Sequence, residues 1–509
     1  MKIPIVDDRL NKITMYRITL YFLMILVAAA VLFGFLGWIS YSPIDILINT
    51  ITLVAVCYVS NYIFAKLFHA VTNFESVFIT SLILLLILPT KFPDNFLFIL
   101  LAGFGAMAMK YLPTINKQHI FNPAAGAIAA ISLLSAEHTA SWWIGTPVMF
   151  PLVLIGGLLI IRKIRREGMV LAFLITNLLL LVVFSLIHFG DFSSVLNAIR
   201  VSFLSTALIF FASIMLVEPL TSPVTKKMQY AYGILVAFLY ATPQMRLFGL
   251  TLTPEQALSV GNIFSYMVSP KYRLLLRLKE KVQVATDTVV FNFGRIDKFA
   301  FTPGQYMEWT LPHKHMDSRG NRRYFSLASA PDEDIKIAVR FHDKPSSYKR
   351  ALLSMNPGDE IVAASLAGDF VMPREISSPV VFMAGGIGVA PFRSIIQDIM
   401  DRNVKADIVL MYSNRNISEV SFAQFFEKAA AYGVRTVYAL TDSASIPANW
   451  NGETGHFTPE MVKKYVPDSD KRIFYVSGPQ PMVQSTEQML RSIPTKKIVT
   501  DYFPGYETI

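Results

Sequence analysis

Residues 385–392 read Gly-Gly-Ile-Gly-Val-Ala-Pro-Phe and decide how the second half of this chain folds. They follow an apolar run at 379–384 that is typical of a strand, and they precede a helix-like segment at 392–400. The glycines let the backbone approach a phosphate closely, Pro391 suits the first turn of a helix, and a helix N-terminus favours an anion. We therefore predict a strand–turn–helix unit that binds the pyrophosphate of a dinucleotide, with a purely structural turn as the alternative.

The sequence after this turn alternates between strand-like and helix-like segments. The strand-like segments lie at 406–412, 434–441 and 472–477, and the helix-like segments lie at 421–432, 458–465 and 480–492. Such alternation is typical of a sheet covered by helices on its faces. It predicts an α/β, Rossmann-like domain that binds NAD(P) and occupies residues 374–509.

A different rhythm precedes this domain. β-type runs lie at 282–293, 305–311, 335–341 and 360–364. Turn signals separate some of them, namely Pro303-Gly304 and Pro357-Gly358. This pattern predicts a small antiparallel β-barrel domain over residues 271–373.

The first half of the chain has the composition of a membrane protein. Of the 509 residues, 53% are hydrophobic and only 16% are charged, whereas a soluble protein carries about 25% charged residues. The imbalance is local, because apolar runs follow one another from about residue 17 to 270. The single cysteine, Cys57, excludes cysteine-ligated Fe–S clusters, disulfides and cysteine-based zinc sites within this chain, and we expect no metal site. We predict a polytopic α-helical membrane domain over residues 1–270.

About 20 apolar residues form a helix that crosses a bilayer, and ten segments approach that length. They lie at 17–39, 43–66, 75–90, 93–113, 121–136, 145–162, 168–188, 200–218, 227–243 and 252–270. With the C-terminus in the cytoplasm, where nicotinamide cofactors are found, 13 Lys and Arg residues fall inside. Only Lys91, Arg200 and Arg246 fall outside. This asymmetry predicts a multi-pass inner-membrane protein with both termini cytoplasmic. It also explains the net charge of +10, so membrane lipid rather than nucleic acid is the expected partner.

Two of the apolar runs end in the same pattern. Residues 88–93 read Leu-Pro-Thr-Lys-Phe-Pro, and residues 218–223 read Glu-Pro-Leu-Thr-Ser-Pro, so Pro-x-x-x-Pro follows the third and the eighth span. These two spans would run in opposite directions. Inverted repeats with broken helices place their binding sites near the middle of the bilayer. The pattern predicts an inverted repeat, and coincidence is the alternative because prolines often end helices.

The membrane half resembles a known family on two stretches. Residues 119–125 (His-Ile-Phe-Asn-Pro-Ala-Ala) and 210–225 resemble the membrane protein NqrB of the sodium-translocating NADH:quinone oxidoreductase and its counterpart RnfD of the Rnf complex. The resemblance implies ten helices in two inverted halves and a flavin in the membrane. Those proteins attach FMN at a Ser/Thr-Gly-Ala-Thr motif that this sequence lacks, so we expect a non-covalent FMN or riboflavin. The candidate residues for it are Asn122, Thr221, Ser222 and Thr225.

The second half resembles the ferredoxin-NADP reductase superfamily. Residues 323–326 read Arg-Tyr-Phe-Ser, and residues 303–306, Pro-Gly-Gln-Tyr, match the strand that precedes that motif. The resemblance implies FAD, with Arg323 on the flavin phosphate, Phe325 against the isoalloxazine and Ser326 near the reactive nitrogen. An arginine suits a phosphate because its guanidinium donates two parallel hydrogen bonds. The implied FAD-binding residues are Gln305, Tyr306, Arg323, Tyr324, Phe325, Ser326, Ser346 and Ser347.

The same resemblance extends to the nicotinamide side. Residues 477–482 read Ser-Gly-Pro-Gln-Pro-Met and resemble the superfamily's Cys-Gly-Pro-x-x-Met, with Ser477 in place of the cysteine beside the nicotinamide. Asn414 and Arg415 follow the second strand of the α/β domain, where the adenosine ribose is read. Arg415 either selects NADPH through its 2'-phosphate or is a surface residue, so NADH and NADPH both stay open. The implied nucleotide-binding residues are Gly385, Gly386, Gly388, Pro391, Asn414, Arg415, Gly478, Pro479 and Met482.

The end of the sequence carries several aromatic rings, in Asp-Tyr-Phe-Pro-Gly-Tyr at 501–506. Phe503 is predicted to cover the flavin, and a tail that merely packs against the domain is the alternative. With Ser326 and Ser477, Phe503 completes the set of candidate catalytic residues.

These patterns predict a membrane-bound, NAD(P)H-dependent oxidoreductase that contains FAD. Electrons from cytoplasmic NADH or NADPH would enter the membrane and reach an extracytoplasmic flavoprotein or another outer acceptor through a membrane-bound flavin. A quinone reduced within the membrane is one alternative, and a subunit of an ion-translocating redox complex is another. A transporter with a regulatory nucleotide-binding tail is the non-enzymatic alternative. Haem between two histidines is disfavoured, because no predicted span carries two histidines.

Overall fold

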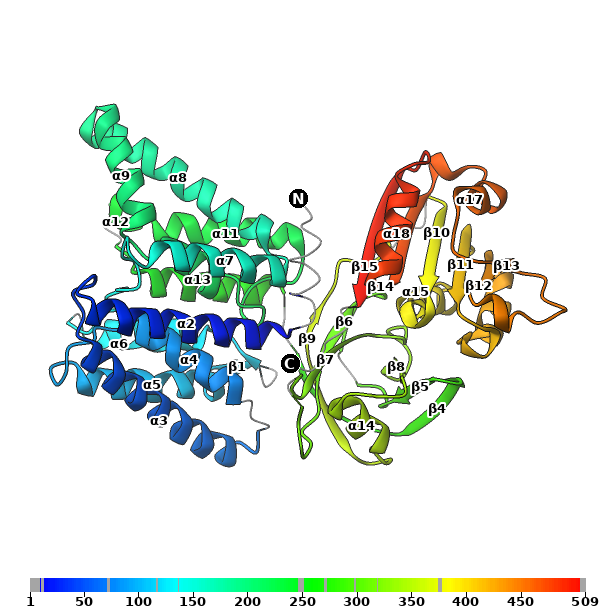
Figure 1. The fold of residues 1–509 in the computed structure, drawn as a ribbon, viewed down its shortest axis with the longest axis horizontal. Coiled ribbons are helices and arrows are strands. Elements are labelled where there is room, and N and C mark those ends of the chain that lie inside the picture. The colour runs from blue at the N-terminus through cyan, green and yellow to red at the C-terminus, as the bar shows by residue number, and fades with distance from the viewer. Residues whose placement is uncertain are drawn as a thin grey trace. The chain divides into compact units, whose positions relative to one another are not determined.

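The chain forms two compact units, Met1–Lys271 and Tyr272–Ile509. The computed structural model describes residues 10, 13–70, 74–115, 118–135, 137–245, 251–269, 272–296, 299–317, 319–373 and 378–503. Figure 1 shows helices throughout the first unit and strands with helices throughout the second. Of the predicted outward-facing cations, Arg246 lies outside the described residues.

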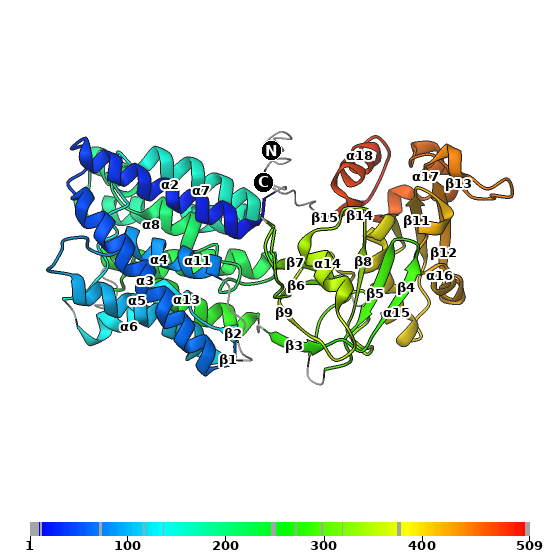
Figure 2. The same cartoon turned by 60° about the horizontal axis from the view of Figure 1, so that its bottom comes forward.

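The first unit is built from helices, and a pair of two-residue strands joins two of them (Figures 1 and 2). The helices of its earlier part are α2 Met15–Phe35, α3 Pro43–Leu67, α4 Phe74–Ile87, α5 Phe96–Tyr111 and α6 Pro123–Leu134. The strands β1 Thr114–Ile115 and β2 Gln118–His119 lie between α5 and α6. The helices of its later part are α7 Phe150–Ile164, α8 Glu167–Phe189, α9 Phe192–Leu204, α10 Leu208–Phe210, α11 Lys226–Tyr240, α12 Thr242–Met245 and α13 Pro254–Val268. A π-helical turn, η1 Phe211–Met215, continues α10.

Three of the described helices are long and apolar enough to cross a membrane. They are Met15–Phe35, Pro43–Leu67 and Glu167–His188. A fourth span arises if Phe192–Leu204 and Leu208–Met215, which meet at 56°, count as one. The apolar helices α4, α5 and α6 are shorter, so the ten predicted spans stay a prediction. The predicted span at 200–218 is wrong as a continuous helix, because the chain bends sharply after α9.

The helices of the two parts of the first unit pack in corresponding ways. α3 packs on α5, and α5 packs on α6; in the later part, α8 packs on α11, and α11 packs on α13. The two parts meet where α2 contacts α7 and where α6 contacts α13. Close approach at the first contact depends on Gly156, because a Cβ there would lie 1.9 Å from the ring of Phe22.

The buried end of α4 is capped by a distant loop. The carbonyl of Leu85 accepts a hydrogen bond from the indole N–H of Trp143 at 2.7 Å. The carbonyl of Ile87 accepts from the backbone N–H of Trp142 at 3.0 Å, and that of Leu86 accepts from Ile144. The last carbonyls of a helix have no partner within the helix itself, so these donors, together with the N–H of Ser141 on the Ile87 carbonyl, satisfy the end of α4.

The second unit begins with two antiparallel sheets. One has the order β3-β9-β6-β7 and the other β4-β5-β8, and a single bridge between Leu327 and Ile337 links them. Their strands are β3 Arg273–Arg277, β4 Glu280–Ala285, β5 Thr288–Asn292, β6 Tyr306–Thr310, β7 Arg322–Ser326, β8 Lys336–Arg340 and β9 Glu360–Ala367. The helix α14, Ser347–Ser354, lies between β8 and β9. The antiparallel pairing agrees with the sequence, and a closed barrel stays a prediction. The expected single run 282–293 is wrong, because a turn at Thr286 and Asp287 splits it into a hairpin.

The remainder of the second unit is an α/β sheet in which every pair of strands is parallel. Its order is β13-β12-β11-β10-β14-β15. The strands are β10 Val380–Gly385, β11 Ile408–Asn414, β12 Val434–Leu440, β13 Glu453–Thr454, β14 Ile473–Pro479 and β15 Lys497–Phe503. The helices are α15 Ala390–Asp401, α16 Ala423–Ala429, α17 Pro459–Tyr465 and α18 Gln480–Leu490. Separate apolar clusters cover the two faces of the sheet, which explains the nearly continuous apolar run of β10.

Candidate functional site

The glycine-rich turn lies at the topological switch point of the parallel sheet. β10 pairs with β11 on one side and with β14 on the other, so the chain leaves its C-terminal end beside a change in strand order. Ligands of open α/β sheets bind in the crevice at such a point. The turn itself is a short 3-10 segment, Gly386–Val389, and α15 begins directly after it with Pro391 in its first turn.

Two of the turn's glycines bring the predicted nucleotide-binding motifs together. A Cβ on Gly388 would lie 2.3 Å from the carbonyl oxygen of Ser477 and 2.5 Å from the Cα of Gly478. A Cβ on Gly385 would lie 3.1 Å from the sulfur of Met482. The segments 385–391 and 477–482, far apart in sequence, are therefore in direct contact, and only glycine fits at position 388.

Ser477 has the environment expected of a residue that faces a ligand. Its side chain is 0% exposed, and its hydroxyl has no hydrogen-bond partner among the residues that the structure describes. A buried polar group without a partner costs about 1–3 kcal/mol, so its presence needs an explanation. A bound nicotinamide amide or ring would provide one at this position.

The predicted flavin motif forms strand β7, and its side chains alternate between two environments. Tyr324 donates to the carboxylate of Glu308 at 2.6 Å, and Arg322 pairs with the same carboxylate at 2.9 Å. The guanidinium of Arg323 instead lies 5.0 Å from the ring centre of Tyr348. The ring centre of Phe325 lies 6.1 Å from the same Tyr348 ring. Arg323 and Phe325 thus lie together, whereas Tyr324 is engaged with Glu308.

Ser326, at the end of β7, repeats the pattern of Ser477. It is 4% exposed, and its hydroxyl has no hydrogen-bond partner in the part of the chain that the structure describes. It pairs in register with Tyr306 from the Pro-Gly-Gln-Tyr stretch, and the side-chain oxygen of Gln305 accepts from the N–H of Thr302 at 2.8 Å. Both hydroxyls of the predicted catalytic set are therefore buried and lack a hydrogen-bond partner among the described residues.

The start of α14 holds the two serines predicted to bind pyrophosphate. Ser346 caps the helix by accepting from the N–H of Lys349 at 3.2 Å. The N–H of Ser347 donates to Asp317 at 2.8 Å, and the Ser347 hydroxyl lies 3.0 Å from Nε2 of His313. Burial acts to raise the pKa of Asp317, but hydrogen bonds from Arg319 and the Ser347 amide outweigh it and lower that pKa. A carboxylate thus uses the donors that a phosphate would use.

Cationic side chains gather around this helix start. Burial, and after it the guanidinium groups of Arg323 and Arg340, lower the pKa of Lys349 to about 8. Like charges held together in a partly buried place are costly unless an anion neutralises them. Asp287 and Glu419 pair with Arg340, and Arg323 and Lys349 stay the candidates to hold the pyrophosphate of FAD.

We expect the affinity for FAD to fall as the pH rises above about 8. Below that pH the amine of Lys349 is already protonated, so FAD binding takes up no proton. Above that pH the amine is neutral, and it must take up a proton when the anionic ligand binds, which weakens binding. The dissociation constant then rises by up to about tenfold per pH unit. Fluorescence titration of FAD-stripped protein measures this. Lys349→Met should bind more weakly with a flat pH profile, whereas Lys344→Met, at an exposed neighbouring position, should behave as the unaltered protein does. A flat profile for the unaltered protein would contradict the expectation.

The remaining predicted residues of this module have less decisive positions. Asn414 is buried at the end of β11, and Arg415 beside it is exposed, so the choice between NADH and NADPH stays open. The backbone of Phe503 ends β15 in register with Pro479, but its side chain lies outside the described residues.

Three of the four residues predicted for a membrane flavin lie in one buried network of the first unit. The N–H of Asn122 donates to Asn262 at 2.8 Å, and Asn262 donates to the carbonyl of Thr221 at 3.2 Å. Ser222 donates to the carbonyl of Glu218 at 2.7 Å, next to the Thr221 hydroxyl, which donates to the carboxylate of the same residue. Thr225 precedes α11 and is exposed.

Several residues of these sites had no signal in the sequence. Asn262 and its hydrogen-bond partner Tyr232 lie on α13 and α11. Single polar residues in two apolar helices do not indicate in the sequence that they share a hydrogen-bond network. In the second unit, Tyr348 supports Arg323 and Phe325 from α14, and no motif marks it. A periodic pattern identifies elements, whereas these contacts depend on how elements pack.

Comparisons with known proteins agree with this geometry. Residues 382–488 match the oxidoreductase NAD-binding domain family. The reductase subunit of glycine betaine monooxygenase from Chromohalobacter salexigens is 25% identical over 200 residues, which are 38% of this chain and 53% of that protein. The F subunit of the Na(+)-translocating NADH-quinone reductase from Neisseria meningitidis serogroup C is 29% identical over 200 residues, 36% of this chain and 49% of that protein. The chain thus spans about half the length of the curated relatives it matches.

Among solved structures, a cytochrome P450 reductase from Amycolatopsis is similar to this chain with a TM-score of 0.41 and 24% identity. The match covers 46% of this chain and 70% of that one. The sequence matches confirm the prediction of a ferredoxin reductase-like module that binds FAD and a nicotinamide dinucleotide. The chain therefore carries an NAD(P)H-dependent oxidoreductase module in its second unit.

Proposed function

We infer that the whole protein is a membrane-bound oxidoreductase that takes a hydride from cytoplasmic NADH or NADPH and passes electrons into or across the inner membrane. The observation that carries this proposal is the contact between the segments 385–391 and 477–482, the second of which includes Ser477 with its buried hydroxyl. The nicotinamide dinucleotide would lie against this turn, with its pyrophosphate at the start of α15.

The residues on the flavin side have distinct tasks in this proposal. Arg323 and the start of α14 would hold the FAD pyrophosphate, and Ser326 would donate a hydrogen bond to the flavin ring. Phe325 would cover one part of the flavin and exclude water. FAD, when bound, accepts two electrons as a hydride and releases them one at a time, which a nicotinamide does not do readily.

In the first unit, the network of Asn122, Thr221 and Asn262 supports a second, non-covalent flavin, FMN or riboflavin. The equivalent packing of α3 on α5 and of α8 on α11 supports the resemblance to membrane proteins with an inverted repeat. Electrons would leave through this group to an extracytoplasmic flavoprotein or another acceptor on the outer face. A bilayer core of about 30 Å separates the two faces, so an intermediate carrier is needed.

Quinone reduction within the membrane is the second candidate. The specific observation in its favour is the similarity of the second unit to the F subunit of an NADH-quinone reductase. Such an enzyme needs no acceptor on the outer face and no second flavin in this chain.

The test is the absorption spectrum of the full chain purified in detergent, with the flavin extracted and quantified before and after NADH or NADPH is added. We expect two flavins per chain, both bleached by the nicotinamide. Asn122→Leu should lose the membrane flavin and keep FAD. One bleached flavin would favour quinone reduction, and a split haem absorption band or the absence of flavin would overturn the proposal.

A further inference from the structure

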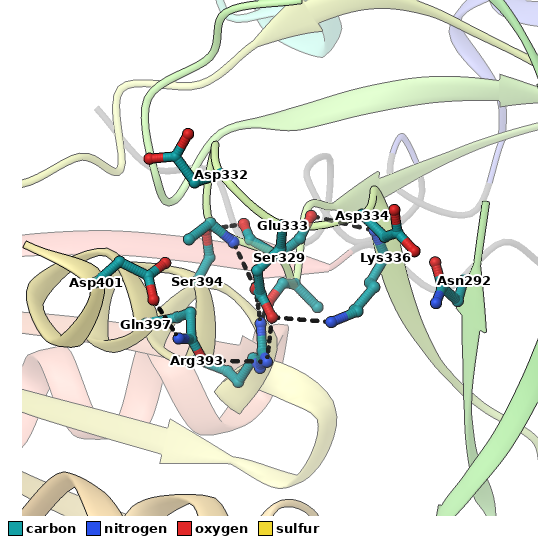
Figure 3. A network of polar contacts seen from close by, with 12 residues as sticks. Asn292, Ser329, Asp332, Glu333, Asp334, Lys336, Arg393, Ser394, Gln397 and Asp401 are labelled. Carbon is teal, nitrogen blue, oxygen red and sulfur yellow. Dashed lines mark hydrogen bonds and ion pairs between the residues drawn. The ribbon is translucent and has the colours of Figure 1, made fainter. Parts of the chain in front are cut away.

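A joint of hydrogen bonds and ion pairs connects the two cofactor-binding parts of the second unit (Figure 3). Arg393, on α15, donates to the carbonyl of Ala328 at 2.9 Å. Its two terminal nitrogens pair with the two carboxylate oxygens of Glu333, at 2.8 Å for Nη2 and Oε1. The next residue, Ser394, donates from its hydroxyl to the carbonyl of Ser329 at 2.6 Å. Adjacent residues of one helix thus hold adjacent carbonyls of the other part.

The ion pair in this joint differs from a surface ion pair. Arg393 is 11% exposed and Glu333 17% exposed, and the guanidinium also lies 4.9 Å from the ring centre of Phe425. Burial acts to raise the pKa of Glu333, but Arg393 and Lys336 outweigh it and lower that pKa, so the carboxylate stays charged. Surface ion pairs contribute little to stability because water and side-chain motion compete with them. The Arg393–Glu333 pair has two hydrogen bonds and is largely buried, so both effects are reduced.

The segment that Arg393 contacts is held together by hydrogen bonds of its own. The N–H of Ala330 donates to Glu333 at 2.9 Å, and the N–H of Lys336 donates to the hydroxyl of Ser329 at 3.1 Å. The N–H of Ala328 donates to the carbonyl of Lys336 at 2.8 Å. The loop between β7 and β8 is therefore closed by its own hydrogen bonds, and a displacement of α15 has to move it as one piece.

The joint lies next to both cofactor motifs along the chain. Ala328 follows Ser326 of the flavin motif by two positions, and Arg393 follows Pro391 of the glycine-rich turn by two positions. Few rotatable bonds separate the joint from either motif. A flavin held by one part and a nicotinamide held by the other therefore have their separation set here.

We propose that Arg393, with Glu333 as its partner, is a positioning residue that sets the distance between nicotinamide and flavin. This inference rests on the proposed function. Hydride transfer needs the reacting atoms about 3–3.5 Å apart, and a misplacement of about 1 Å costs about 100-fold in rate. The step oxidises the nicotinamide by two electrons and reduces FAD by the same two, so its rate reports the geometry directly.

Loss of this joint should misplace the two parts and leave them attached. A second contact holds them elsewhere, where the N–H of Thr286 donates to the carbonyl of Ser418 at 3.0 Å. Beside it, Arg340 pairs with Glu419 at 2.5 Å. We therefore expect a variant at Arg393 to keep its fold while the relative position of the two cofactors relaxes.

The experiment compares the full chain with Arg393→Gln in anaerobic stopped-flow kinetics. We expect the rate constant of FAD reduction by NADH to fall about 100-fold. FAD content and the NADH dissociation constant should stay within about threefold, because neither binding site loses a group that touches its ligand. Arg393→Lys should restore part of the rate. The control is Arg402→Gln, which removes an i,i+4 pair with Asp398 just past the end of α15 and should leave the rate unchanged.

Two further readouts do not depend on turnover. The long-wavelength absorption of oxidised nicotinamide stacked on reduced flavin should weaken in Arg393→Gln, and hydrogen exchange of the amides at 328–336 should accelerate. If Arg393→Gln does not fold, Glu333→Gln is the replacement test, because it preserves the shape of the side chain and removes its charge. We expect this variant to slow FAD reduction by about tenfold. An unchanged rate in the folded variant, or a rate that falls only in proportion to lost FAD, overturns the inference. Absence of FAD reduction in the unaltered protein would instead overturn the proposed function, together with what rests on it.

Discussion

Replacing Gly388 with alanine is expected to lower kcat/KM for NADH by about 100-fold to 1000-fold. A Cβ at this position would lie 2.3 Å from the Ser477 carbonyl oxygen and 2.5 Å from the Gly478 Cα, and both are backbone atoms that no rotamer change can move. The turn and the segment 477–482 must therefore separate, and the nicotinamide loses the surface that both provide. NADH-dependent reduction of an artificial acceptor such as ferricyanide measures the loss.

The matched control for that variant is Gly358→Ala. Gly358 has a φ of +96° and open space around the position of a Cβ, so alanine introduces backbone strain without a clash. The strain should destabilise the fold by about 1–2 kcal/mol and leave the kinetics unaffected, because residue 358 lies in the turn before β9. If Gly388→Ala kept the activity of this control, the glycine-rich turn would not be the nicotinamide site.

Replacing Arg323 with glutamine is expected to weaken FAD binding by about 100-fold, so the protein should be purified largely without this flavin. Arg323 is buried beside Tyr348, and the shorter, neutral amide of glutamine cannot replace its charge. Flavin content after purification and fluorescence titration with FAD give the measurement. Retention of a full complement of FAD would exclude Arg323 from the phosphate site.

Arg322→Gln gives the opposite profile and serves as the control. Arg322 pairs with the buried carboxylate of Glu308 on the other side of β7. Its loss removes an ion pair from that buried carboxylate and should lower the free energy of unfolding by about 3 kcal/mol, while the affinity for FAD stays the same. Neighbours in sequence thus separate stability from cofactor binding, because successive side chains of a strand point to opposite faces.

The second unit could be predicted from sequence where local patterns determine structure. The glycine-rich turn between a strand and a helix appears in the structure as expected, since the requirement for glycine is local. The strand β15 has no comparable signal, because an edge strand depends on its partner β14 for hydrogen bonds. The pairing of Arg393 with Glu333 joins residues 60 positions apart, and no spacing rule relates them.

The first unit is harder to predict, because apolar composition measures how long a run is and ignores where the helix inside it ends. The run at 75–90 predicts a span, and the helix within it, α4, stops at Ile87 after 14 residues. The run at 200–218 contains the end of α9 and a π-helical turn that meet at an angle. Hydrogen bonds from other segments decide such breaks, as at Asn49, whose side chain donates to the carbonyl of Thr90 at 2.6 Å.

The cap on α4 also affects how the protein is made. An unsatisfied backbone group costs several kcal/mol in lipid, and the donors that satisfy the end of α4 belong to residues 141–144. Trp143 is synthesised 58 residues after Leu85, the residue whose carbonyl it caps. In the membrane protein proposed above, the end of α4 is therefore left without these partners until that later loop has been made. The earlier half of this unit thus reaches its final state only with help from chain that is translated after it.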